Sequence, residues 1–242
     1  MPWQLVVALV LSCFMQVLQN GAYAARIAGV RTGQIATAIS LFSLVVTISR
    51  TANMFYAPMI GTLSDAAGAA VRKFGMVGAH AFEWQMRFII LSATIGAIIG
   101  SLLIPTFVIL YVRGIHSFER RDSLLSASLR LFDLRTLIAV GRETYLPALT
   151  SLTRFSHSDV PVKLLIANAV LTAIYSVGVT AATYASVLDP NQARATLMLS
   201  SIVNGFGTIA MAFVVDPTSA RIVDRAVKGQ LEMRFERAVS SG

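Results

Sequence analysis

Residues 33–63 read GQIATAISLFSLVVTISRTANMFYAPMIGTL, an almost unbroken apolar run that contains a single charged residue, Arg50. A transmembrane helix needs about 20 mostly apolar residues to cross a hydrocarbon core about 30 Å thick. One helix over this run would be about 46 Å long at 1.5 Å per residue, which is more than a single crossing requires. Because the residue before a proline disfavours the helical conformation, the break is expected just before Pro58. The run therefore predicts a spanning helix over 33–57, followed by a bent segment that ends near Asp65.

The composition of the whole chain also indicates a membrane protein. Of its 242 residues 55% are hydrophobic and 13% are charged, and Lys and Arg exceed Asp and Glu by 20 to 12. Soluble proteins carry about 25% charged residues, so a soluble enzyme or a disordered chain is disfavoured. In so apolar a sequence the basic excess favours a membrane surface over nucleic acid. The single cysteine, Cys13, excludes an intrachain disulfide and a thiolate metal site.

Four further stretches have the length and composition of membrane spans. They are 3–20, 88–112, 162–188 and 195–215. Pro105 is expected to kink the second of these. The first lacks the basic start of a secretory signal and is expected to be a retained helix. The sequence thus predicts an all-α, polytopic integral membrane helical bundle, with one membrane domain over 1–242 and five or six transmembrane helices.

Two charged segments are expected to be amphipathic and to lie at the membrane interface, 113–161 and the tail 219–237. Both are rich in basic residues, and by the positive-inside bias both are cytoplasmic. Five crossings then place the N-terminus outside and the C-terminus in the cytoplasm. A sixth span would have to come from 124–152, which is highly charged.

A polar stripe follows one face of the helix expected over 33–57. Ser40, Ser43, Thr47, Arg50 and Asn53 recur at intervals of three or four residues, so they share one helical face. An arginine at the centre of a span costs about 2.5 to 3.5 kcal/mol, which marks Arg50 as a functional candidate. Its guanidinium matches the geometry of phosphate. The alternative is that the hydroxyls bond their own backbone, while Arg50 extends to the interface.

The loop before this helix is a second candidate for anion binding. Arg26 and Arg31 lie there with two glycines and a threonine, where the chain enters the long apolar run. Free amides at a helix start favour an anion. Ordinary contact with membrane phospholipids explains the same pattern.

Two charged clusters are weaker candidates for a cavity or a proton relay. His80, Glu83 and Arg87 fall on one helical face, and Arg142 adjoins Glu143. An interfacial cluster and a surface ion pair are the simpler readings. The histidines lack metal-ligand spacing, and the sequence contains no recognisable catalytic motif, so neither a metal nor a cofactor is expected.

Gly96 and Gly100 form a Gly-x-x-x-Gly pair that permits close helix packing. The partner can be another helix of this chain or a second copy, so a homo-oligomer stays open.

The stretch from Ala25 to Asp65 reads ARIAGVRTGQIATAISLFSLVVTISRTANMFYAPMIGTLSD and resembles the Amj family of bacterial lipid II flippases. The tail is also similar to the family's C-terminal end, in Asp216-Pro217, Asp224 and Lys228-Gly229.

This resemblance implies a bacterial plasma-membrane protein that moves lipid II from the cytoplasmic to the outer leaflet. Lipid II is an undecaprenyl pyrophosphate that bears the peptidoglycan precursor. On this basis Arg26 and Arg31 are hypothesised to attract the pyrophosphate, and Arg50 with Asn53 to hold it in passage. Ser40, Ser43 and Thr47 would line the polar path, and other membrane lipids would contact the outside of the bundle.

Two other functions fit the same residues. A membrane enzyme acting on polyprenyl phosphates would also need an acid, base or nucleophile, and the candidates are His80, Glu83, His116 and Glu143. A structural subunit of a membrane complex would use its helices for packing alone.

Overall fold

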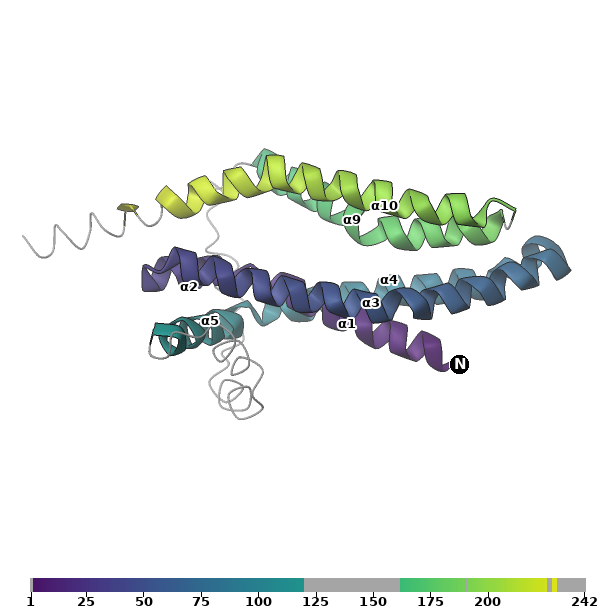
Figure 1. Cartoon of the computed structure of the whole chain (residues 1–242), viewed down its shortest axis with the longest axis horizontal. Helices are drawn as coiled ribbons and strands as arrows, with labels where there is room; N and C mark the ends of the chain where they lie inside the picture. The colour runs from purple at the N-terminus through teal and green to yellow at the C-terminus, as the bar shows by residue number, and fades with distance from the viewer. Residues whose placement is uncertain (1, 120–161, 190, 226–227, 230–242) are drawn as a thin grey trace, which may run out of the picture. The chain divides into compact units, whose positions relative to one another are not determined.

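The computed structural model describes residues 2–119, 162–189, 191–225 and 228–229 (Figure 1). Within these ranges the regular elements are all helical. They are α1 (Trp3–Ala22), α2 (Ala24–Thr32), α3 (Ile35–Phe74), α4 (His80–Leu102), α5 (Ile104–Glu119), α9 (Val162–Leu188) and α10 (Ala193–Ala210). A 3₁₀ turn, Gly75–Ala79, joins α3 to α4, and a π turn, Met211–Val215, follows α10. Most of the amphipathic segment expected over 113–161 lies outside the described residues, as does the tail beyond 229.

Four stretches are long and apolar enough to cross a membrane in the part of the chain that the structure describes. They are Trp3–Thr32, Ile35–Leu102, Ile166–Leu188 and Ala193–Arg225. Each overlaps a span expected from the sequence, and the second overlaps two of them, 33–57 and 88–112. The prediction of an all-α membrane bundle is therefore confirmed.

The helices form two compact units. The first contains most of α1, the part of α3 from Ser49, nearly all of α4, and the α9–α10 pair, which lie side by side (Figure 1). The second contains the end of α1, α2, the first part of α3, and α5.

In the first unit, α3 and α4 form a helical hairpin. Gly75 adopts a left-handed conformation with φ of 66°, which an L side chain would disfavour, and so allows the sharp reversal. A Cβ on Gly78 would lie 2.5 Å from the backbone of Ala70, so only glycine permits this close approach. The hairpin buries one apolar face of each helix, including Ile60 on α3 and Phe82 on α4.

The break expected before Pro58 does not occur, because α3 continues through this residue to Phe74. A proline inside a helix costs about 3 kcal/mol through a lost hydrogen bond and a steric clash. Tyr56, Ile60 and Leu63 are buried on either side of Pro58 in the core of the first unit. Their burial favours an unbroken helix and offsets that cost.

Pro105 interrupts its helix. α4 ends at Leu102 and α5 begins at Ile104, which places Pro105 in the first helical turn, where its missing N–H costs no bond. The kink predicted within 88–112 is thus present as a break between two helices. At the other end of the chain, Pro217 does not close the last helix. The π turn precedes it, and the helix then runs on to Arg225.

α1 and α4 run parallel in the first unit. The Ser92 hydroxyl donates to the Leu9 carbonyl at 2.6 Å, and four residues further along both helices Gly96 lies against the Cys13 backbone. A Cβ on Gly96 would overlap the Cys13 carbonyl oxygen, so the Gly-x-x-x-Gly pair uses Gly96 for packing within the chain.

α3 and α9 also run parallel. Tyr56 shares a hydrogen bond with Thr180, and further along both helices the hydroxyls of Ser64 and Ser186 lie 3.3 Å apart. All four side chains are buried. Because hydroxyls in an apolar interior need partners, these two contacts fix the register of the two helices.

The second unit has a core of small side chains. α2 packs against α5, and α2 contributes only Ala24, Ala25 and Ala28 to the buried cluster. Larger apolar side chains, among them Leu41 and Ile115, come from α3 and α5.

Candidate functional site

Arg26 and Arg31 are carried by α2, a short helix of nine residues with defined ends. A turn at Tyr23 separates it from α1. At its C-terminal end the Thr32 hydroxyl donates to the Ala28 carbonyl at 2.9 Å, and Gly33 takes a left-handed φ of 75°. This ending satisfies a helix-end carbonyl and redirects the chain into α3.

The Arg26 guanidinium lies over two aromatic rings. It lies 5.6 Å from the centre of the Tyr23 ring and 5.8 Å from that of Phe42. The two rings are themselves in contact, with centroids 6.0 Å apart. Cation–π contacts are worth about 0.5–1 kcal/mol at exposed sites and more where water is excluded. The half-buried Arg26 charge is therefore oriented in advance of any ligand.

Arg31 is exposed in the last turn of α2. Five residues separate it from Arg26, which is about 140° around a helix at 100° per residue. The structure thus places the two arginines on one short helix but does not bring them to one face.

The polar stripe lies on the outer face of α3. Ser43, Thr47, Arg50 and Asn53 are exposed and Ser40 is half-buried, whereas the opposite face of α3 is buried. The Ser40 hydroxyl donates to the Ala36 carbonyl at 3.1 Å, as the simpler reading of the stripe requires.

The Thr47 hydroxyl likewise donates to the Ser43 carbonyl at 2.8 Å. Both hydroxyls donate their proton to the backbone of their own helix, so toward a ligand they can act only as hydrogen-bond acceptors. Arg50 is exposed and carries the positive charge of the stripe. Arg50 is therefore the point of the stripe that can attract an anion.

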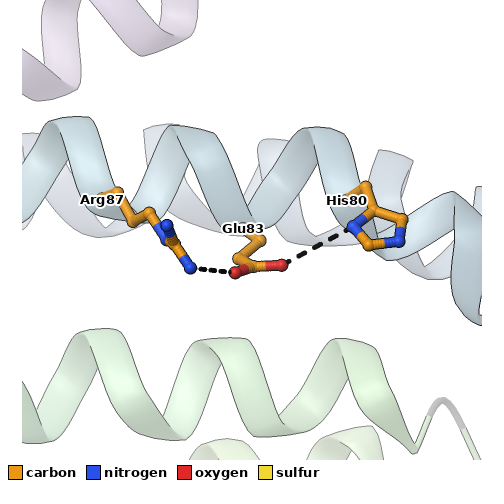
Figure 2. Close-up of polar contacts among 3 residues, drawn as sticks. All are labelled: His80, Glu83 and Arg87. Atoms are coloured by element: carbon orange, nitrogen blue, oxygen red, sulfur yellow. Dashed lines mark hydrogen bonds and ion pairs between the residues drawn. The ribbon is translucent and has the colours of Figure 1, made fainter.

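His80, Glu83 and Arg87 form an ion-pair chain on one exposed face of α4 (Figure 2). Arg87 donates to one Glu83 oxygen, and His80 Nδ1 lies 3.7 Å from the other. The side chains of His80 and Arg87 are 72% and 59% exposed, as expected of an interfacial cluster.

Aromatic residues surround the same cluster. The Arg87 guanidinium lies 4.9 Å from the Trp84 ring centre, and Trp84 and Phe88 are both exposed. Tryptophan and paired charges are typical of a membrane–water interface. The geometry favours the interfacial reading over a proton relay. Arg142 and Glu143 lie outside the described residues.

Tyr111 is a candidate that the sequence did not reveal. This α5 residue is 2% exposed, and its hydroxyl is the buried side-chain oxygen for which the described part of the chain supplies no hydrogen-bond partner. Such an unsatisfied group costs about 1–3 kcal/mol. A tyrosine in an apolar run gives no sign of this, because the signal depends on neighbours that are distant in sequence.

Among the residues that the structure describes, no three His, Cys, Asp or Glu side chains group together as metal ligands do.

A sequence model of the family described as "Amj: Alternate to MurJ" matches residues 11–240 of the chain. The chain belongs to the Amj family. It is 33% identical over 222 residues to the Lipid II flippase Amj of Bacillus subtilis (strain 168), which covers 90% of this chain and 80% of that protein. No solved structure matches it. The resemblance seen between Ala25 and Asp65 is confirmed and extends along almost the whole sequence.

In this Amj-family chain the candidate residues fall into three separate places. Arg26 and Arg31 lie on α2, the stripe with Arg50 follows α3, and the ion-pair chain occupies the start of α4.

Proposed function

We propose that this protein is a lipid II flippase, which moves the undecaprenyl-pyrophosphate-linked peptidoglycan precursor from the cytoplasmic to the outer leaflet. The observation that carries the proposal is the 33% identity, over 90% of the chain, to a protein named Lipid II flippase Amj. It supports a transporter over an enzyme acting on polyprenyl phosphates or a structural subunit.

The proposed route for the polar head follows α2 and then the outer face of α3. Arg26, oriented by Tyr23 and Phe42, and Arg31 attract the pyrophosphate at the cytoplasmic side. Arg50 and Asn53 then hold the head in passage, and the exposed position of both side chains supports this. Because the stripe faces away from the packed core, the polyprenyl chain can stay in the lipid beside it.

The proposal includes five crossings, by α1, α3, α4, α9 and α10. The stretch Ile35–Leu102 has 68 residues, about 100 Å of helix, which is far more than one crossing needs. In a five-span chain the first and third spans run in the same direction, and so do the second and fourth. The parallel pairs α1/α4 and α3/α9 support this order. The N-terminus then lies outside and α2 lies at the cytoplasmic face.

The proposal is tested by the amount of lipid II that is accessible at the outer leaflet of cells depleted of their other flippases. Wild-type protein is expected to restore accessibility and growth. Arg50→Ala at an equal membrane level is expected to abolish both, because the head loses its fixed counter-charge. Arg194→Ala, which removes an exposed arginine on α10, is the matched control and should behave as wild type. Failure of the wild-type protein would refute the flippase assignment, and normal activity of Arg50→Ala would refute the role of Arg50.

A further inference from the structure

The Tyr111 hydroxyl is buried among apolar side chains. The cluster around it in the second unit consists of alanine, leucine, valine and isoleucine residues, with Leu41, Val45 and Ile115 among the larger ones. None of these side chains can accept or donate a hydrogen bond. Buried polar groups nearly always have a partner, so a hydroxyl at 2% exposure to which the described residues offer none calls for an explanation.

The helix α2 covers part of this core with the smallest apolar side chains. It packs against α5 and buries Ala24, Ala25 and Ala28. Alanine side chains bury little area, so separating α2 from α5 exposes little apolar surface. α2 begins after Tyr23, whose backbone is itself helical (φ −62°, ψ −22°), and ends at Gly33, whose φ of 75° is left-handed. The change of direction at Gly33 is a joint about which a short rigid segment can move relative to α3.

The same helix carries the two arginines of the proposed entry site. Arg26 and Arg31 both belong to α2, so any movement of this helix moves both charges relative to α5. An anion that these arginines bind would then be brought next to the core that contains Tyr111.

We propose that Tyr111 is a ligand-binding residue whose hydroxyl donates a hydrogen bond to a phosphate oxygen of the lipid pyrophosphate when α2 moves away from α5. This inference rests on the proposed function. In the packed state the described residues offer the hydroxyl no partner, whereas in the open state the ligand supplies a charged acceptor. The ligand therefore binds the open state more tightly and shifts the population toward it.

Tyr56 provides a matched control within the chain. It is also a buried tyrosine, at 6% exposure, but its hydroxyl is bonded to Thr180. Tyr56→Phe removes a hydrogen bond that exists in the packed state, and Tyr111→Phe removes a hydroxyl to which the described residues offer no hydrogen bond. The two substitutions are chemically identical, so they separate an effect on folding from an effect on the ligand.

The experiment compares wild type, Tyr111→Phe and Tyr56→Phe as full-length purified proteins. Thermal unfolding is measured in detergent, binding is measured with undecaprenyl pyrophosphate and with undecaprenol, and transport is measured with lipid II in proteoliposomes. Tyr111→Phe is expected to unfold at the wild-type temperature or above it. It should bind undecaprenyl pyrophosphate about tenfold or more weakly, as expected for a lost hydrogen bond to a charged group, and bind undecaprenol unchanged. Tyr56→Phe should unfold at a lower temperature and bind both lipids as wild type does.

Two results would overturn the role of Tyr111. Wild-type binding and transport by Tyr111→Phe would show that the hydroxyl does not meet the ligand. A lower unfolding temperature for this variant would show that the hydroxyl already has a partner in the packed state. A wild-type protein that neither binds undecaprenyl pyrophosphate nor transports lipid II would instead refute the proposed function.

Discussion

At the scale of single residues, the structure distinguishes two arginines that look equivalent in the sequence. Arg26 is half-buried and lies over the rings of Tyr23 and Phe42, whereas Arg31 is exposed. An oriented charge loses less conformational freedom on binding than a mobile one, because its side chain is ordered beforehand. Arg26 is therefore expected to contribute more to pyrophosphate affinity than Arg31.

Phe42→Leu tests whether the rings orient this charge. The substitution removes one of the two rings that contact the Arg26 guanidinium. It should weaken the binding of undecaprenyl pyrophosphate by about two- to fivefold, since such contacts are worth about 0.5–1 kcal/mol. Titration of the purified variant measures the change. In an Arg26→Ala background the same substitution should have no further effect, because the two residues act through one contact. Equal losses in both backgrounds would show that Phe42 acts independently of Arg26.

At the scale of helices, Pro58 and Pro105 show how far local rules predict this fold. Each apolar segment expected from the sequence overlaps a long apolar helix, because length and composition alone identify such segments. The sequence placed a break at Pro58, where α3 continues, and only a kink at Pro105, where the helix divides in two. The difference arises from tertiary packing around Pro58, which a rule about neighbouring residues does not include.

The candidate site was predictable to a similar extent. Spacing showed that Ser40, Thr47 and Arg50 share one face of α3, but periodicity does not show whether that face points to the core or away from it. Only the structure, in which the opposite face of α3 is buried, shows that the polar face is exposed. The orphaned hydroxyl of Tyr111 lies among residues of α1, α2, α3 and α5, so no local pattern could predict it.

The contact between α1 and α4 gives a prediction at this scale. Gly96→Ala should lower stability by about 1–3 kcal/mol, because the added methyl overlaps the Cys13 backbone and forces the helices apart. Thermal unfolding in detergent measures this change. Gly205→Ala is the control, since a Cβ on Gly205 in α10 meets nothing within 4 Å and alanine favours a helix more than glycine does. Equal stability of the two variants would contradict the close approach of α1 and α4.

At the scale of the whole molecule, the five-crossing order predicts on which side of the membrane each connection lies. The chain has one cysteine, Cys13, so a background without thiols needs a single substitution. Ile27 on α2 and Met76 in the α3–α4 turn are both exposed and suitable for new cysteines.

In a Cys13→Ala background, Met76→Cys is expected to react with a membrane-impermeant thiol reagent added to intact cells. Ile27→Cys should react only after the membrane is permeabilised, because the proposed topology, which follows the positive-inside bias, puts α2 at the cytoplasmic face. The reverse pattern would invert the orientation. Labelling of both positions from one side would show that α3 does not cross the bilayer.

The π turn at Met211–Val215 changes the phase of the helix that contains it. A π turn holds one residue more than an α turn, so it rotates everything that follows by about 100° around the axis. The side chains from Asp216 to Arg225 are therefore out of phase, around the helix axis, with those of α10. The helix itself continues without a gap through the π turn. The continuous helix therefore presents residues before and after the π turn on faces that point in different directions. Deletion of a single residue in this turn would bring Arg221 and Arg225 back into phase with the span.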